Sequence, residues 1–97
     1  MFEPLYDVSE LTHVHFIGYA TDQARYDFSI VYTDHFFGKT LVICMQTGRS
    51  ALLDAHDLTN TDYLQLKFGI ANPESAAELS LCLAARIPSL QITDQYE

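Results

Sequence analysis

The fold of this chain is decided by residues 25–54, which run RYDFSIVYTDHFFGKTLVICMQTGRSALLD. Polar and apolar residues alternate through residues 25–33, broken only by Val31, and this pattern predicts a strand with one face in a core. Residues 41–45 repeat the pattern after a compact turn. Gly48 at the first central position of residues 47–50 predicts a two-residue type II′ hairpin loop. Three consecutive antiparallel strands follow.

The remaining elements extend this hairpin in both directions. Residues 12–20 alternate as a further strand, and matching the apolar faces pairs residue 14 with 32, 30 with 43, and 45 with 52. Residues 63–68 alternate as a fifth strand. Asn72 and Pro73 are typical of an N-cap and first helical position, and they predict a helix over residues 73–87. We expect an α+β fold, an antiparallel meander of four or five strands with one C-terminal helix packed on one face.

Length and composition define the class of protein. A chain of 97 residues with 48% hydrophobic content builds one core, so residues 1–97 form a single domain. We expect an irregular segment at 1–11, the meander over 12–68, and a tail at 88–97 that is either a short edge strand or disordered. The start of the chain carries no signal-peptide pattern, and Cys44 and Cys82 lie in apolar runs, which together favour reduced thiols and a cytoplasmic protein.

The charge and hydropathy patterns exclude two kinds of partner. The net charge is −8, with five scattered basic residues, so the chain has no basic footprint for a nucleic acid. Its apolar runs are shorter than the roughly 18 residues that cross a membrane. No motif requires a cofactor.

The predicted register leaves a second apolar face that one helix cannot cover. This face contains Val31, Val42 and Cys44, with Ile17 and Leu53, and we expect a homodimer to form through it. The alternative is that residues 1–11 fold over it as a lid. Phe36 and Phe37 are adjacent in a short turn, so both rings cannot point inward and one is expected at the surface. That ring either contacts a protein partner or folds against a nearby tyrosine.

Histidines and arginines suggest two candidate ligand sites. His13 and His15 share a strand face about 6.7 Å apart, and His35 lies in the next turn, a set that would suit a metal ion. The alternative is that these histidines are only the solvated row of a strand. At the other end of the sheet, Arg25 and Arg49 near the helix N-terminus would suit an anion. The alternative there is surface ion pairs with Asp22, Asp27 or Glu74.

Catalytic motifs are missing from the sequence. Residues 48–51 do not match the G-x-S-x-G nucleophile elbow, and Cys44 lies about 12 Å from His15 by strand geometry, too far for a catalytic pair. The first hypothesis is therefore a non-enzymatic interaction module that forms a homodimer. The second is a small metal- or anion-binding protein, with hydrolase activity as an option.

Two stretches resemble a known family. Residues 32–39 (YTDHFFGK) and 46–51 (QTGRSA) resemble a family of small cytosolic proteins of Gram-positive bacteria classed as a domain of unknown function. The likeness extends from about Thr12 to Ile87, and it implies no activity, substrate or cofactor. Lys39 and Arg49 match the family pattern, whereas the histidines do not.

Overall fold

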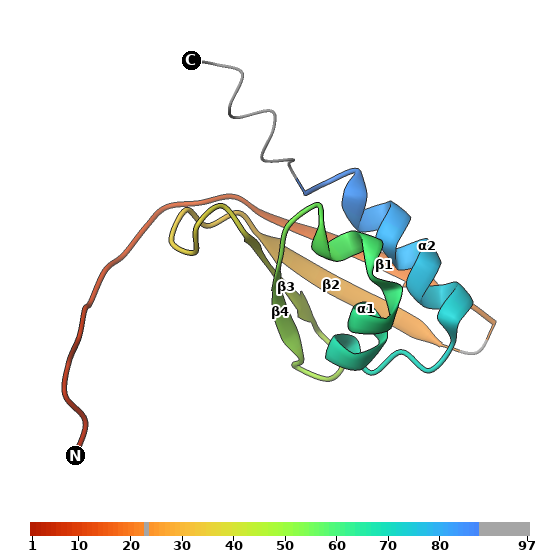
Figure 1. Ribbon diagram of the computed structural model, residues 1–97, viewed down its shortest axis with the longest axis horizontal. Helices are drawn as coiled ribbons and strands as arrows, with labels where there is room; N and C mark the ends of the chain where they lie inside the picture. The colour runs from red at the N-terminus through yellow and green to blue at the C-terminus, as the bar shows by residue number, and fades with distance from the viewer. Residues whose placement is uncertain (23, 88–97) are drawn as a thin grey trace.

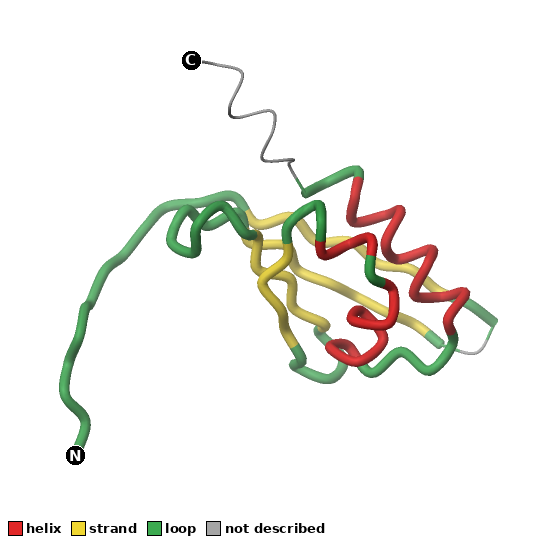
Figure 2. The backbone as a smooth tube through the Cα atoms, in the orientation of Figure 1, coloured by secondary structure: helices red, strands yellow, loops and turns green. Residues whose placement is uncertain are grey.

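The computed structural model describes residues 1–22 and 24–87, in two layers (Figures 1 and 2). An antiparallel sheet has the order β1-β2-β3-β4, and the helices cover one of its faces. The α+β meander with a C-terminal helix is thus confirmed, and the predicted tail at 88–97 lies outside the described residues. The elements are β1 (Val14–Ala20), β2 (Arg25–Val31), β3 (Thr40–Cys44), β4 (Ser50–Leu53), the 3-10 helix η1 (Asp57–Thr59), α1 (Thr61–Phe68) and α2 (Pro73–Ala84).

The predicted pairing of β1 with β2 is wrong by one residue. Val14 pairs with Val31 rather than with Tyr32, and His15 pairs with Ile30. A slip of one residue exchanges the two faces of a strand, so Ile17 faces the core and Phe16 faces outward. The connecting loop sets this register: the Thr21 N–H donates to the Ala24 carbonyl at 2.7 Å, and Ala20 pairs with Arg25, which makes the loop one residue shorter than expected.

The predicted faces of β3 are also exchanged. Ile30 pairs with Val42 and Phe28 pairs with Cys44, and both β3 side chains are fully buried under the helices. The expectation that Val42 and Cys44 lie on an uncovered interface is therefore wrong. The physical reason is that residues 41–45 are all apolar, so either alternate set suits a core and hydrophobicity alone does not select one.

The hairpin between β3 and β4 differs from the predicted type II′ loop. The Cys44 N–H donates to the Arg49 carbonyl, and the Gly48 N–H donates to the Cys44 carbonyl, both at 2.8 Å. The loop therefore spans residues 45–48, with Gly48 in the left-handed region at φ 77°. Thr40 consequently pairs with Leu53. Because the faces of β3 are exchanged, Leu53 beside it is buried in the core rather than placed on the second face.

The predicted fifth strand at 63–68 is helix α1. The Asn60 side chain accepts a hydrogen bond from the Tyr63 N–H, and Gly69 ends the helix in the left-handed conformation at φ 70°. Leu64 and Phe68 are buried, while Leu66 is 73% exposed. The row of apolar residues at 64, 66 and 68 fits a strand, but 64 and 68 also fit one helical face. The two capping residues favour the helix.

Helix α2 begins as the sequence predicts and ends earlier. The Asn72 side chain accepts from the Glu74 N–H, and Pro73 occupies the first helical position. The helix ends at Ala84, three residues before the predicted end, although the Ile87 N–H still donates to the Leu83 carbonyl at 2.9 Å. None of the helices in residues 1–22 and 24–87 is both long and apolar enough to cross a membrane.

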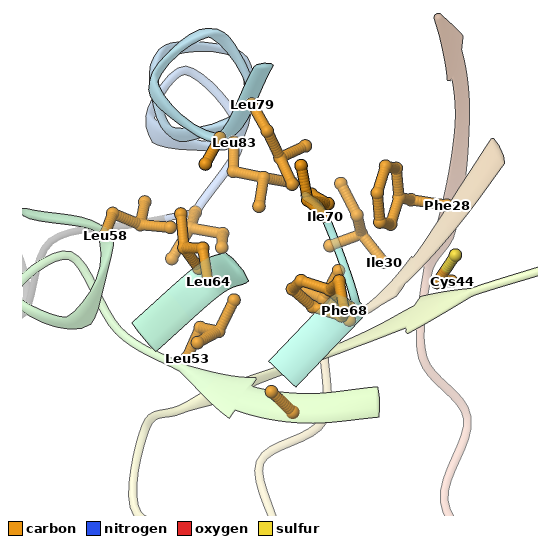
Figure 3. Close-up of a cluster of buried hydrophobic side chains, with 14 residues drawn as sticks. Phe28, Ile30, Cys44, Leu53, Leu58, Leu64, Phe68, Ile70, Leu79 and Leu83 are labelled. Carbon is orange, nitrogen blue, oxygen red and sulfur yellow. The ribbon is translucent and has the colours of Figure 1, made fainter. Parts of the chain in front are cut away.

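The core lies between the helices and one face of the sheet (Figure 3). Its centre is the contact of Phe28 from β2 with Phe68 from α1, whose rings meet edge to face with centroids 5.4 Å apart. Helix α2 adds buried side chains above them. The buried apolar residues are Phe28, Ile30, Val42, Cys44, Ala51, Leu53, Leu58, Leu64, Phe68, Ile70, Ala76, Leu79, Leu83 and Ile87.

Candidate interaction site

Strand β1 forms an open edge of the sheet. It lies first in the strand order, most of its residues are exposed, and its sequence VHFIGYA contains neither a charged residue nor a proline. Natural proteins usually protect edge strands with such residues or keep them short. The opposite edge, β4, has four residues and packs against α1. The β1 edge is therefore the more available of the two.

The hydrogen-bond pattern shows which backbone groups of β1 face outward. The Tyr32 N–H donates to the His13 carbonyl at 3.1 Å, and antiparallel ladders alternate. In β1, His15, Ile17 and Tyr19 thus bond to β2. The N–H and C=O groups directed at the open edge belong to the alternate residues, Val14, Phe16, Gly18 and Ala20.

The sheet face opposite the helices is apolar, although its residues are not those predicted. One row crosses all four strands through the pairs Val14–Val31, Val31–Leu41 and Leu41–Leu52. Phe16, which is 68% exposed, extends this surface along β1. We call these five residues the outer face. Of the predicted interface, Val31 lies on it, whereas Val42 and Cys44 do not.

Residues 1–11 form an arm that projects away from the sheet (Figure 1). Phe2, Leu5, Val8 and Leu11 in this arm are 62–103% exposed. At its base, the Glu10 carboxylate accepts hydrogen bonds from Thr33 Oγ1 at 2.9 Å and from the Asp34 N–H at 3.2 Å. The arm does not fold over the outer face, so the expected lid is not formed within one chain.

A groove lies between α2 and the hairpin end of β1 and β2. Its volume is about 370 Å³, within the range of binding clefts. Hydrogen bonding with the Cys82 thiol, followed by burial, raises the pKa of Tyr19 on its wall. We call it the α2 groove; its lining is Tyr19, Ala20, Thr21, Tyr26, Phe28, Ile70, Ser75, Glu78, Leu79, Leu81 and Cys82.

The turn at residues 34–38 exposes one aromatic ring. Phe37 is 95% exposed and has a φ of 54°, a conformation that is uncommon for a bulky residue. Phe36 is half-buried and meets the His35 ring edge to face at 4.8 Å. The ring of Tyr6 in the arm also lies beside His35, with the two ring centroids 5.2 Å apart. The exposed member of the pair is thus Phe37.

The histidines proposed as metal ligands are not gathered into one site. Nε2 of His15 accepts a hydrogen bond from Nε of Arg86 at 3.3 Å. His35 contacts one ring at a tilted angle and another edge to face, and His13 is exposed. Within the described part of the chain, no group of three or more His, Cys, Asp and Glu side chains is placed to hold a metal ion.

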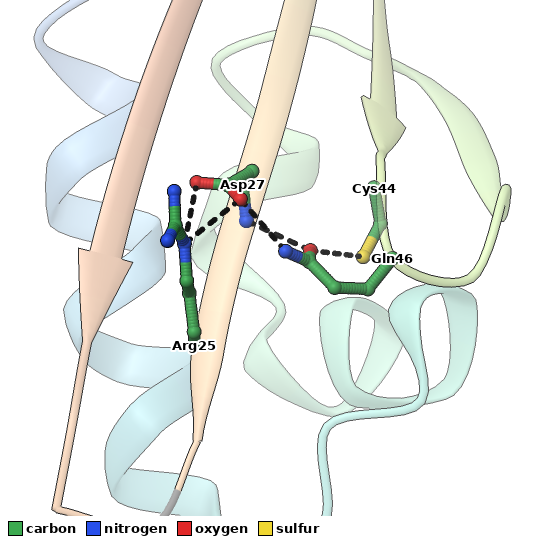
Figure 4. A network of polar contacts seen from close by, with 4 residues as sticks. All are labelled: Arg25, Asp27, Cys44 and Gln46. Atoms are coloured by element: carbon green, nitrogen blue, oxygen red, sulfur yellow. Dashed lines mark hydrogen bonds and ion pairs between the residues drawn. The ribbon is translucent and has the colours of Figure 1, made fainter.

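The arginines proposed for an anion site have separate partners. Nε of Arg25 lies 3.0 Å from an Asp27 carboxylate oxygen, and Gln46 donates to the same oxygen at 2.8 Å. Figure 4 shows this network, which continues through Gln46 to the Cys44 thiol. Nη1 of Arg49 donates to the Leu66 carbonyl at 3.4 Å. Arg25 therefore has an ion-pair partner, and Arg49 ties the hairpin between β3 and β4 to α1.

Sequence reasoning missed a charged cluster beside the 3-10 helix. Nζ of Lys39 lies 2.9 Å from Asp57 and 3.7 Å from Asp54. The Asp54 carboxylate accepts from the Asp57 N–H at 2.9 Å, and Asp57 accepts from the Asp54 N–H at 3.0 Å. The spacing Asp-x-x-Asp at the start of a helical turn is the signal that would have indicated mutual capping. Lys39 thus has structural partners in both carboxylates.

Replacing Lys39 with Met should lower stability in a pH-dependent manner. Burial opposes ionisation of Asp57, but the hydrogen bonds from Lys39 and Asp54 outweigh it and hold the pKa of Asp57 below its ordinary 3.8. The bond to Asp57 also raises the pKa of Lys39 above 10.5. The pair therefore stabilises the fold between about pH 4 and 10, and the contribution is lost as the pH falls through the lowered pKa of Asp57.

Because Lys39 is partly exposed, solvent screening limits the expected loss to about 0.5–1 kcal/mol at pH 7. Urea denaturation of wild type and Lys39→Met at pH 7 and pH 2.5 measures it, with Lys67→Met as a control for loss of a charge. An equal difference between the two proteins at both pH values would contradict the prediction.

The comparison with known proteins identifies a family. A family model described as SAV0927-like matches residues 5–84, which include the sheet, both α-helices and most of the arm. No curated protein matches the chain. The family description names no activity, in agreement with the resemblance to an uncharacterised family. With four-fifths of its length matched, this chain belongs to the SAV0927-like family.

Proposed function

We propose that this protein is a cytosolic, non-enzymatic interaction module that forms a homodimer by pairing β1 with β1 of a second copy. Its proposed setting is a Gram-positive bacterium, as the resemblance implies. The observation that carries the proposal is the open β1 edge, seven residues long and without charge or proline. Pairing satisfies the outward N–H and C=O groups of such an edge.

One antiparallel register uses the whole strand. A two-fold axis at Ile17 pairs residue 14 with 20 and 16 with 18 of the second copy, so all seven residues take part. The outward residues at 14, 16, 18 and 20 then form hydrogen-bonded pairs, about eight bonds in total. Any other centre leaves some of these groups unpaired.

The side chains near the axis are complementary in this register. Phe16 meets Gly18 of the second copy, which has no side chain, and an aromatic ring packs well beside a glycine in a sheet. The Asp27 carboxylate lies over Gly18, 2.6 Å from where a Cβ would be, and its partner Arg25 can stack on the ring. The outer faces of both copies join into one apolar surface that contains Val31.

The contacts of the polar side chains support binding rather than catalysis. The residues first considered for chemistry hold the fold together: His15 with Arg86, Arg25 with Asp27, and Arg49 with the Leu66 carbonyl. Cys44 and Cys82 are unpaired, which fits a reducing cytosol. The second hypothesis, a metal- or anion-binding protein, has less support because its residues are dispersed. Phe36 and Phe37 stay predicted contacts for a protein partner.

Light scattering after size-exclusion chromatography tests the dimer. Wild type is expected at twice the mass of the 97-residue chain, and Phe16→Lys at the monomer mass, because a lysine on the edge blocks strand pairing. Leu66→Lys is the matched control: Leu66 is 73% exposed against 68% for Phe16, but it lies on α1. A monomeric wild type, or a Phe16→Lys dimer as tight as wild type, would overturn the proposal.

Hydrogen exchange locates the interface within β1. The amides of Val14, Phe16, Gly18 and Ala20 should be protected in the dimer and lose that protection in Phe16→Lys. The amides of Ile17 and Tyr19, which bond to β2, should be protected in both proteins. A dimeric wild type in which Val14, Phe16, Gly18 and Ala20 exchange much faster than Ile17 and Tyr19 would show that the dimer forms elsewhere.

A further inference from the structure

We infer that, in the dimer, the arm of each copy occupies the α2 groove of the other. This inference rests on the proposed β1 pairing. The described residues present an apolar arm and an apolar groove, and no residue of the arm lines the groove of its own chain. The arm instead projects away from the sheet (Figure 1). One exchange between two copies would bury both.

The proposed register directs the arm to the groove. With the axis at Ile17, Val14 pairs with Ala20 of the second copy, so the residues before Val14 run past the end of that strand. Tyr19, Ala20 and Thr21 at this end form part of the wall of the groove. The arm of one copy therefore arrives beside the groove of the other as a direct continuation of the paired strands.

The lengths favour exchange over folding back. A chain's own groove lies at the far end of its β1, and the span from Leu11 to Tyr19 is eight residues, about 26 Å at strand spacing. Residues 2–11 have about the same reach, so only the tip of the arm could arrive at its own groove. In the dimer, Val14 lies opposite Ala20 on the wall of the other copy's groove. The arm therefore begins at that groove, and its length allows Leu5 and Val8 to turn back into it.

The base of the arm also points it outward. The hydrogen bonds from Thr33 and Asp34 to Glu10 hold the chain at the end of β1 opposite the hairpin, where it leaves the domain (Figure 2). The family match begins at Leu5, so most of the arm is part of the matched domain. Its apolar residues suit a wall of tyrosine, phenylalanine, isoleucine and leucine.

The two cysteines provide a reporter for occupancy of the groove. Cys82 lines the groove and is half-buried, while Cys44 is buried in the core. A thiol reagent such as 5,5′-dithiobis(2-nitrobenzoate), with the labelled site identified by mass spectrometry, should therefore react at Cys82 when the groove is open. Deleting residues 1–9, which leaves Glu10 in place, is expected to raise the Cys82 labelling rate roughly tenfold in the dimer, because access limits thiol reactivity.

Two further variants separate this inference from the dimer itself. Leu5→Ser with Val8→Ser should label as the deletion does, and Glu3→Gln, a polar change in the same arm, should label as wild type. A deletion variant that stays dimeric and labels at the wild-type rate would overturn the arm exchange while leaving the dimer intact. A monomeric wild type would instead overturn the proposed function.

A disulfide crosslink tests the arm exchange without the deletion, which could also weaken the dimer. Leu5→Cys, oxidised in dilute solution, should form a disulfide with Cys82 of the second copy and migrate at twice the chain mass without reductant. Replacing Cys82 with Ser in that variant should abolish the crosslink. A disulfide between the same two positions within one chain, at monomer mass, would overturn the exchange.

Discussion

Replacing Val42 with Asp is expected to abolish cooperative folding. Val42 is fully buried and sits between Ile30 and Ala51 in the ladder, so an introduced carboxylate would have no polar partner. Burying an unpaired charge costs several kcal/mol, even when the group becomes protonated instead. A domain of this size has about 5–15 kcal/mol of stability in total. Circular dichroism during heating measures the result as a missing or strongly lowered transition.

The neighbouring residue supplies the matched control. Leu41 is adjacent in the sequence and lies on the outer face, between Val31 and Leu52. Leu41→Asp places its carboxylate at the solvent side of the sheet, and we expect a folded protein with a loss of about 1 kcal/mol. In the register predicted from the sequence, Leu41 would face the core and Val42 would lie on the opposite face. A folded Val42→Asp variant beside an unfolded Leu41→Asp variant would therefore restore that register.

Replacing Phe28 with Ala should have the next largest effect. Phe28 is 1% exposed and joins β2 to α1 through its edge-to-face contact with Phe68. Truncation removes this contact and leaves a cavity between sheet and helix, for which the usual cost is about 3–5 kcal/mol. Urea denaturation at one fixed protein concentration gives the value, since dimerisation would make stability depend on concentration.

Two additional proteins make the Phe28 prediction specific. Phe37→Ala changes the same residue type at an exposed site, and we expect a change within about 0.5 kcal/mol. A double-mutant cycle with Phe68→Ala should show a coupling of about 0.5–1.5 kcal/mol from the aromatic pair. A loss for Phe28→Ala no larger than that for Phe37→Ala would place Phe28 outside the core.

Local signals in the sequence predicted the elements with the clearest chemistry. Asn72 and Pro73 predicted the start of α2, because an amide side chain caps free N–H groups and proline suits the first helical turn. Residues 63–68 were harder, since their alternation fits a strand while residues 64 and 68 also lie on one helical face. Asn60 and Gly69, at the two ends of α1, were the available evidence for a helix.

The candidate site could be predicted only in part. An uncovered apolar face followed from the number of apolar residues on the strands, and Val31 lies on it. Val42 and Cys44 were assigned to that face because one shifted register places them there. The Lys39–Asp57 contact and the α2 groove depend on which loops and helices approach each other, and strand alternation carries no information about that.

The sequence by itself determined the four strands, their antiparallel order from residue 12 to residue 53, the start of α2, and the acidic charge. Tertiary structure alone decided which side of β1, β3 and β4 faces the core, whereas the alternation in β2 already indicated its buried side, with Phe28 and Ile30. In residues 41–45 every side chain is apolar, so both faces satisfy the hydrophobic effect equally well. The loop at 21–24 and the turn at 32–39 set the registers of β1 and β3 against β2 through their hydrogen bonds. Because side chains alternate with period two, each of these shifts by one residue exchanged the core and solvent faces of a whole strand.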